Sequence, residues 1–240
     1  MSVFSKIFGG GSQLNLSGTT DWHCHILPGV DDGVQTMNDA IAILTQYEIA
    51  GIKEVWLTPH IMEDIPNTTD ELRERFDELQ AAYKGSVKLH LAAENMIDNL
   101  FKTRLAARDF LPIGEKGDHL LVETSYYQPP MEFYDTLKRI QDAGYHPVLA
   151  HPERYCYMDD RDYNRLYSMQ VKAQLNLVSL AGGYGKQAQE KAQTLLEKGY
   201  YTLFGSDLHH LSIFQEGLNT KALKSGMPLQ LQGIPNYLVS

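Results

Sequence analysis

Seven short runs of apolar, β-branched or aromatic residues recur along this 240-residue chain, and most are separated by segments with helical periodicity. The runs predict strands over residues 18–25, 53–59, 87–93, 119–124, 146–151, 173–179 and 201–206. Helices are predicted over 36–50, 70–83, 131–143 and 187–198, with Thr36 as an N-cap and Gly51 directly after the first helix. This alternation is typical of parallel βα units, so we expect one α/β domain, either a barrel of about seven strands or an open doubly wound sheet.

Charge and composition argue against several classes of protein. The formal net charge is −9 and no basic cluster occurs, which is unfavourable for binding nucleic acid. Two cysteines do not make a disulfide framework, and no apolar run is long enough to cross a membrane. The first residues lack a signal-peptide pattern, so we expect a cytoplasmic protein with a flexible lead-in over 1–17 and the domain over 18–240.

Histidines and carboxylates stand at or just after the ends of six predicted strands. Because the carboxyl ends of parallel strands lie at one edge, we expect these side chains to meet there. Imidazole and carboxylate ligands without thiolate suit zinc, manganese or iron, and their number suits two or three ions. Individually they could be loop, capping or strand-end residues, and Asp31 is more readily a turn residue. The candidate ligands are His23, His25, Asp32, His60, Glu94, Glu123, His151, Asp207 and His209.

The remaining chemistry-bearing residues favour phosphate as the group that is bound. Arg154 follows the candidate ligand His151 by three residues and offers a planar fork suited to phosphate, although it could also form a structural ion pair. Neither cysteine is followed six residues later by arginine, so the phosphate loop of cysteine phosphatases is missing, and so is a glycine-rich nucleotide loop. Cys24 should face away from its two histidine neighbours, because side chains alternate along a strand. Four tyrosines near strand ends could line a substrate rim or simply be surface residues: Tyr126, Tyr127, Tyr155 and Tyr157.

Several motifs together resemble the PHP (polymerase and histidinol phosphatase) superfamily. They are His-x-His at 23–25, Pro-Gly-x-Asp-Asp-Gly at 28–33, Thr-Pro-His at 58–60, Ala-His-Pro-Glu-Arg-Tyr at 150–155 and Ser-Asp-x-His at 206–209. More narrowly, the chain resembles bacterial tyrosine-protein phosphatases encoded with capsule and exopolysaccharide machinery. The resemblance runs from about residue 20 to 235 and includes Gln-Leu-Asn-Leu-Val-Ser-Leu-Ala-Gly-Gly-Tyr-Gly at 174–185.

The resemblance implies a single-domain, distorted TIM-like (β/α)7 barrel, the PHP fold, with two to three divalent metal ions, most commonly manganese. It places the ligands on the nine candidates above and phosphate binding on Arg154. The implied substrate is phosphotyrosine on a bacterial tyrosine kinase that controls polysaccharide export, and an oligomer is compatible with the family. We expect Arg154, Asp207 and His209 to take part in catalysis and Tyr155 to contact substrate.

One departure from the family leaves alternatives open. Relatives often carry a second arginine shortly after the last histidine, whereas residues 211–216 here read Leu-Ser-Ile-Phe-Gln-Glu. The alternatives are a phosphoesterase for a small molecule, such as a histidinol phosphatase, and a barrel that keeps the fold as a non-catalytic regulatory module.

Overall fold

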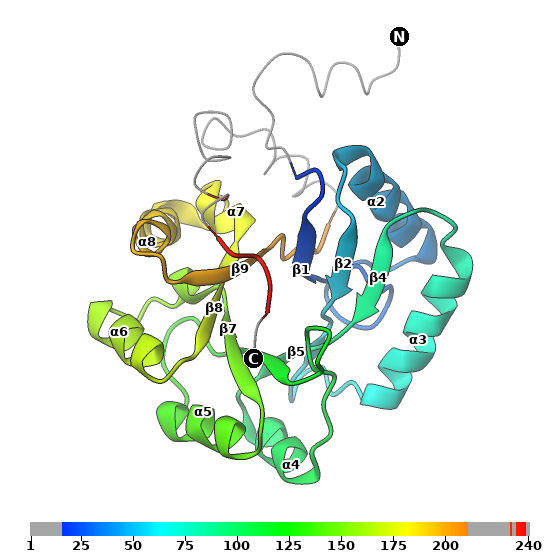
Figure 1. Cartoon of the computed structure of the whole chain (residues 1–240). Coiled ribbons are helices and arrows are strands. Elements are labelled where there is room, and N and C mark those ends of the chain that lie inside the picture. Colours follow the sequence, from blue (N-terminus) through cyan, green and yellow to red (C-terminus); the bar gives the residue numbers. More distant parts are fainter. Residues whose placement is uncertain (1–15, 211–230, 232–233, 239–240) are drawn as a thin grey trace.

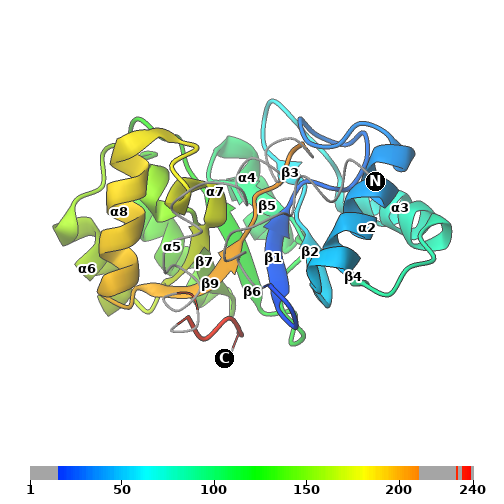
Figure 2. The ribbon, with the colours of Figure 1, turned by 90° about the horizontal axis from the view of Figure 1, so that it is seen from above.

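The computed structural model describes residues 16–210, 231 and 234–238 (Figure 1). Its strands are β1 (Thr20–Cys24), β2 (Glu54–Leu57), β3 (His60–Ile61), β4 (Lys88–Leu91), β5 (Glu94–Met96), β6 (His119–Glu123), β7 (His146–Ala150), β8 (Lys172–Asn176) and β9 (Tyr201–Gly205). Its helices are α2 (Met37–Ala50), α3 (Thr69–Ala82), α4 (Asn99–Ala107), α5 (Phe133–Asp142), α6 (Asp160–Ser168), α7 (Leu177–Leu180) and α8 (Gly185–Glu197), and a 3-10 turn, η1, spans Pro152–Arg154. The strands lie at the centre and the longer helices surround them (Figures 1 and 2).

All paired strands are parallel, and they form two sheets. One sheet has the order β1-β2-β4 and the other the order β3-β5-β6-β7-β8-β9. The chain passes directly from β2 to β3 and from β4 to β5 across two-residue breaks, so two stretches of chain contribute to both sheets. Pro59 lies in the first break, where it offers no N–H for the ladder. The α/β class and the parallel pairing that the sequence predicts are confirmed.

The first and last strands lie side by side without forming a continuous ladder. The N–H of Asp207 donates to the carbonyl of His23 (2.8 Å), and the N–H of His25 donates to the carbonyl of Leu208 (2.9 Å). Towards the opposite end of the strands, Asn236 forms hydrogen bonds with both β1 and β9. Its N–H donates to the carbonyl of Thr202 (2.9 Å), and its side-chain amide donates to the carbonyl of Thr20 (3.2 Å). Among the described residues the strands therefore form a single α/β domain with two parallel sheets rather than one closed sheet.

The core has an outer and an inner part. Between helix α2 and the strands, Ile43, Leu44 and Tyr47 are almost completely buried. A second, separate cluster of buried side chains contains Trp22 and Trp56, whose rings stack with their centroids 5.6 Å apart. Burying each such side chain stabilises the fold by about 1.5–3 kcal/mol, so this packing holds the strand ends in fixed positions.

The predicted helix α2 has the ends that the sequence indicates. The hydroxyl of Thr36 accepts a hydrogen bond from the N–H of Asp39, and Gly51 ends the helix with a φ of 81°, a conformation that glycine adopts without strain. Within the described ranges the longest helices have 14 residues, and none is long and apolar enough to span a bilayer.

Other expectations need correction. Helices α4 and α6 were not predicted, and residues 177–179 form helix α7 instead of continuing a strand. The reason is Asn176, whose side-chain oxygen accepts from the N–H groups of Val178 and Ser179 and so caps a helix. Residues 1–15 of the expected lead-in lie outside the described residues, but Leu16 is 3% exposed and packs in the core.

Candidate metal centre

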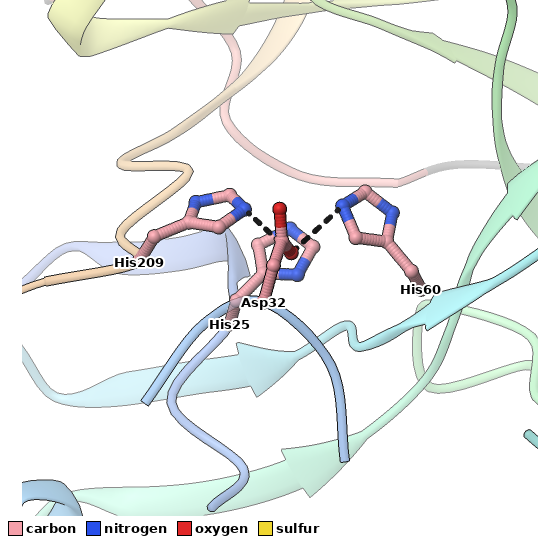
Figure 3. A group of neighbouring side chains, drawn as sticks. All are labelled: His25, Asp32, His60 and His209. Atoms are coloured by element: carbon pink, nitrogen blue, oxygen red, sulfur yellow. Dashed lines mark ion pairs between the residues drawn. The ribbon is translucent and has the colours of Figure 1, made fainter. Parts of the chain in front are cut away.

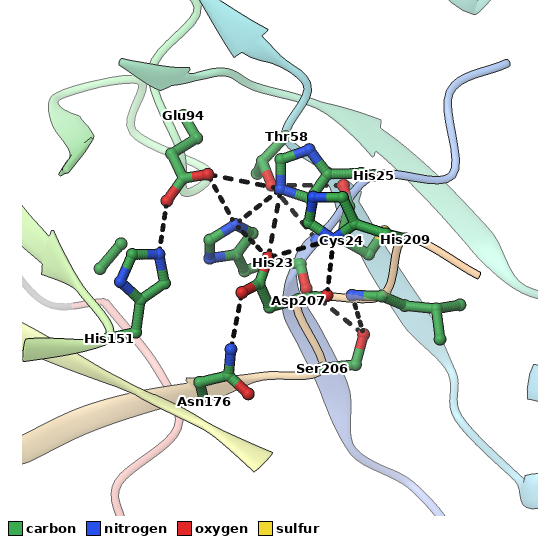
Figure 4. A network of polar contacts seen from close by, with 12 residues as sticks. His23, Cys24, His25, Thr58, Glu94, His151, Asn176, Ser206, Asp207 and His209 are labelled. Atoms are coloured by element: carbon green, nitrogen blue, oxygen red, sulfur yellow. Dashed lines mark hydrogen bonds and ion pairs between the residues drawn. The ribbon is translucent and has the colours of Figure 1, made fainter. Parts of the chain in front are cut away.

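The two histidines of the His-x-His motif converge on one point. His23 and His25 come from the end of β1, and their Nε2 atoms lie 3.1 Å apart (Figure 4). The Nδ1–H of His25 donates to Asp31 Oδ2 at 2.8 Å, and the Nδ1–H of His23 donates to Gln174 Oε1 at 3.1 Å. When a cation is bound, each ring keeps its proton on Nδ1 and turns the lone pair of Nε2 towards the ion. Without a cation, a proton can lie between the two Nε2 atoms.

Two buried carboxylates complete the first group. Glu94 Oε2 lies 3.1 Å from Nε2 of His23 and 3.3 Å from Nε2 of His25. Asp207 Oδ1 lies 3.4 Å and 3.3 Å from the same two atoms. Burial alone would lower the pKa of His23, but the charges of Glu94 and Asp207 outweigh it and raise that pKa to about 9. The site attracts positive charge strongly.

The second group contains buried polar atoms without hydrogen-bond partners. His60 Nδ1 lies 3.2 Å from Glu94 Oε2 and 3.0 Å from Glu123 Oε1, but none of these three buried atoms makes a hydrogen bond within the described part of the chain. An unsatisfied buried polar atom costs about 1–3 kcal/mol. Beside them, His151 Nε2 lies 2.9 Å from Glu94 Oε1. A cation held by these side chains would satisfy the unpaired atoms.

The third group lies at the open side of the cluster (Figure 3). Asp32 Oδ1 is 3.6 Å from His60 Nε2 and 3.4 Å from His209 Nε2, and His25 belongs to the same group. The hydrogen bond to His209 is the largest of the effects that lower the pKa of Asp32 to about 2. The side chain of Asp32 is 65% exposed, whereas those of Glu94 and Glu123 are buried.

These three groups contain eight of the nine side chains that the sequence identified as candidates, and the ninth, His151, lies beside them against Glu94. Their donor atoms are imidazole nitrogens and carboxylate oxygens, which fits two or three divalent ions of the zinc, manganese or iron type. The thiol of Cys24 points elsewhere and lies 3.6 Å from the carbonyl oxygen of Trp56. Asp31, expected in a turn, accepts from the N–H of Gly33 (2.9 Å), and it also orients His25.

Arg154 lies against the first group. Its Nη1 donates to Asp207 Oδ2 at 2.9 Å, and the side-chain amide of Asn176 donates to the same oxygen at 2.6 Å. The centre of its guanidinium lies 4.3 Å from the ring centroid of Tyr126 and 3.9 Å from that of Tyr184. Tyr184 was not predicted to lie at the site. Its position as the one aromatic residue among the glycines of Ala-Gly-Gly-Tyr-Gly was the signal that could have indicated it.

The four rim tyrosines take different positions. Tyr127 is 80% exposed and Tyr126 and Tyr157 are half-buried, but Tyr155 is completely buried. The hydroxyl of Tyr155 donates to the carbonyl of Ala150 (3.0 Å) and accepts from the N–H of Thr124 (3.2 Å). After η1 the chain turns Tyr155 towards the core, so the expected contact of this residue with substrate is not supported by its position.

Comparison with known proteins identifies the family to which the chain belongs. The family model for capsular polysaccharide synthesis, CpsB/CapC, matches residues 19–219. The chain is 30% identical over 198 residues to tyrosine-protein phosphatase YwqE of Bacillus subtilis, covering 80% of this chain and 77% of that protein. It is 25% identical over 210 residues to tyrosine-protein phosphatase CpsB of Streptococcus pneumoniae, covering 80% of this chain and 83% of that protein.

A solved structure supports the fold. A chain from crystal structures of YwqE from Bacillus subtilis and CpsB from Streptococcus pneumoniae, described as unique metal-dependent tyrosine phosphatases, matches with a TM-score of 0.74 and 24% identity. The match covers 92% of this chain and 100% of that chain. On the extent of the family match and the identity to YwqE, this chain belongs to the CpsB/CapC family of capsular polysaccharide synthesis.

Proposed function

We propose that this protein is a metal-dependent protein tyrosine phosphatase. The observation that carries the proposal is a cluster of eight imidazole and carboxylate side chains, with His151 against Glu94, beside the guanidinium of Arg154. Among the described residues, several buried polar atoms of this cluster have no hydrogen-bond partner. The relatives YwqE and CpsB bear the name of that activity.

The residues divide the work of phosphate ester hydrolysis. His23, His25, Glu94 and Asp207 would hold one ion (Figure 4). His60 and Glu123 would hold a second with Glu94, with His151 beside Glu94. Asp32 and His209 would complete a third site with His25 and His60 (Figure 3). When bound, such ions supply positive charge for the phosphate oxygens and a nucleophile at neutral pH. Arg154 donates its remaining N–H groups to the phosphate and so stabilises the charge that develops during the reaction.

Asp207 and His209 have different roles in this proposal. Burial would raise the pKa of Asp207, but the nearby histidines, His23 first, hold it well below the usual range, so the carboxylate stays ionised and suits binding of cations. The Nδ1–H of His209 donates to the carbonyl of Asp207 (3.0 Å), which leaves its Nε2 as a base at the open side of the cluster. When only the first two groups hold ions, His209 is therefore the better placed of the two to hold a proton near the tyrosyl oxygen that leaves; an ion in the third group would make its Nε2 a ligand instead.

The substrate that we propose is phosphotyrosine on a tyrosine kinase that controls capsular or exopolysaccharide synthesis, in keeping with the family description. We further propose that the two sheets are parts of one distorted seven-stranded barrel and that manganese is the bound metal. A cytoplasmic location and an oligomeric state stay predictions.

Activity of the manganese-loaded protein on three substrates tests this function: a phosphotyrosyl peptide, a phosphoseryl peptide and histidinol phosphate. We expect metal-dependent release of phosphate from the phosphotyrosyl peptide, reduced about 100- to 1,000-fold by Arg154→Ala. Arg161→Ala is the matched control, because the side chain of Arg161 is 92% exposed and, among the described residues, forms its ion pair with Asp159 at the start of its own helix. Hydrolysis of histidinol phosphate alone would reject the proposal, and the metal-loaded protein acting on none of the three would favour a regulatory module.

A further inference from the structure

The segment Ala-Gly-Gly-Tyr-Gly between α7 and α8 has no part in the cation groups, although it lies beside them in the fold. Gly182 and Gly185 each have a φ of +88°, which side chains other than glycine rarely adopt. A Cβ at Gly183 would lie 2.4 Å from Cγ1 of Val178. Three glycines are therefore needed for this turn, and Tyr184 is the large side chain that the turn presents.

The turn places Tyr184 against Arg154. The guanidinium carbon lies 3.9 Å from the centroid of the Tyr184 ring and 4.3 Å from that of Tyr126, which follows strand β6. Both distances are well within the range of about 6 Å for attraction between a cation and an aromatic face. Two separate loops thus each supply a ring for one guanidinium.

Apart from these rings, little holds the guanidinium in place. Within the described residues, the guanidinium makes one hydrogen bond, from Nη1 to Asp207 Oδ2 at 2.9 Å, and its other N–H groups have no protein acceptor. A single hydrogen bond fixes one nitrogen and leaves the plane of the fork free to turn, whereas bidentate binding of phosphate depends on that plane. No arginine follows Arg165 in the sequence, so a second fork from the C-terminal part of the chain is excluded.

We propose that Tyr126 and Tyr184 are positioning residues that fix the plane of the Arg154 guanidinium so that its free N–H groups meet a phosphate group. This inference rests on the proposed function, in which Arg154 binds phosphate. The rings act through Arg154, and their hydroxyl groups are not required.

Equilibrium binding of inorganic phosphate to the manganese-loaded protein tests the proposal without requiring turnover. Tyr126→Leu and Tyr184→Leu remove a ring, and we expect each to weaken phosphate binding about 5- to 30-fold. Tyr126→Phe and Tyr184→Phe keep the ring as matched controls and should bind within about twofold of the unchanged protein. With a phosphotyrosyl peptide, the leucine variants should raise KM more than they lower kcat.

A double-mutant cycle separates positioning from packing. In the background of Arg154→Ala, the leucine changes should have no further effect on phosphate binding, because the residue through which they act is gone. An equal loss in both backgrounds would overturn the proposal, as would phenylalanine variants that lose as much as the leucine variants. Thermal unfolding and bound manganese per chain are measured alongside; weaker binding that is fully explained by lost metal would also overturn it.

The same measurements distinguish this inference from the proposed function. A protein that binds phosphate through Arg154 but does not cleave phosphotyrosine would refute the function and leave the role of the two rings standing. Phosphate binding that does not depend on Arg154 would refute the role of the rings.

Discussion

Replacing Asp31 by asparagine should weaken metal binding although Asp31 is not itself a candidate ligand. The side chain of Asp31 is inaccessible to solvent, and its Oδ2 accepts from His25 Nδ1 (2.8 Å) and from the N–H of His60 (3.1 Å). Burial would raise the pKa of Asp31, but His25 lowers it, so the group is an ionised acceptor at neutral pH. This contact keeps the proton of His25 on Nδ1 and its lone pair on Nε2, facing the cluster.

Asparagine cannot satisfy all three donors that surround Asp31. If its oxygen keeps the bond from Gly33, its NH₂ group faces the N–H of His60 and the Nδ1–H of His25. His25 must then move its proton to Nε2, where it blocks ligation, and the N–H of His60 loses its acceptor. Removing a partner of this kind lowers metal affinity about 10- to 100-fold, which corresponds to about 1.4–2.8 kcal/mol.

The assay is competition for metal between the protein, freed of metal by chelation, and a chromophoric chelator. Asp39→Asn is the matched control, because Asp39 is an exposed aspartate in the first turn of α2 whose side chain accepts from the Thr36 hydroxyl. We expect Asp39→Asn to leave metal affinity unchanged. Metal affinity of Asp31→Asn within about twofold of the unchanged protein would refute the orientation of His25 as described.

Three further changes test the packing of the fold, one beside the site and two at the opposite end of the strands. Tyr155→Phe should lower the free energy of unfolding by about 1–3 kcal/mol, because it breaks buried hydrogen bonds, and leave KM for a phosphotyrosyl peptide unchanged; a raised KM at full stability would contradict the buried position. Asn236→Ala removes the side-chain hydrogen bonds that join β1 to β9, and urea unfolding should show a loss of about 1–3 kcal/mol; no loss would mean that this contact does not support the junction. Burial first, and then Lys172, lowers the pKa of His119 from 6.5 to about 4, so the unfolded chain binds more protons between these values and stability falls as pH falls from 6.5 to 4. His119→Gln should remove this part of the pH dependence, and an unchanged profile would contradict it.

The candidate ligands could be identified from the sequence because they follow short apolar runs, although His60 and Glu94, expected at the ends of strands, begin β3 and β5 instead. His60, Glu94 and His151 each follow a short apolar run. Parallel strands bring such positions to one edge both in a closed barrel and in an open sheet. The number and type of side chains at that edge were therefore accessible without knowing the details of the fold.

Other features depend on contacts between distant segments and could not be read locally. The role of Asp31 follows from its bond to His25, which lies across a turn, and the sequence alone favours a simple turn residue. Asn176 looks like a polar residue within a strand until its side chain is seen to cap α7 and to reach Asp207. Tyr155 was expected at the site, but η1 directs it into the core. Tyr184 was not expected there, but the glycine turn brings its ring to Arg154.

Phosphate release from a phosphotyrosyl peptide, measured against the number of manganese ions bound per chain, tests the role of this cluster most directly. We expect no release from the metal-free protein and full release only when at least two ions are bound. Release that persists after the metal is removed, or no release from the fully loaded protein, would contradict a metal-dependent tyrosine phosphatase built on this cluster.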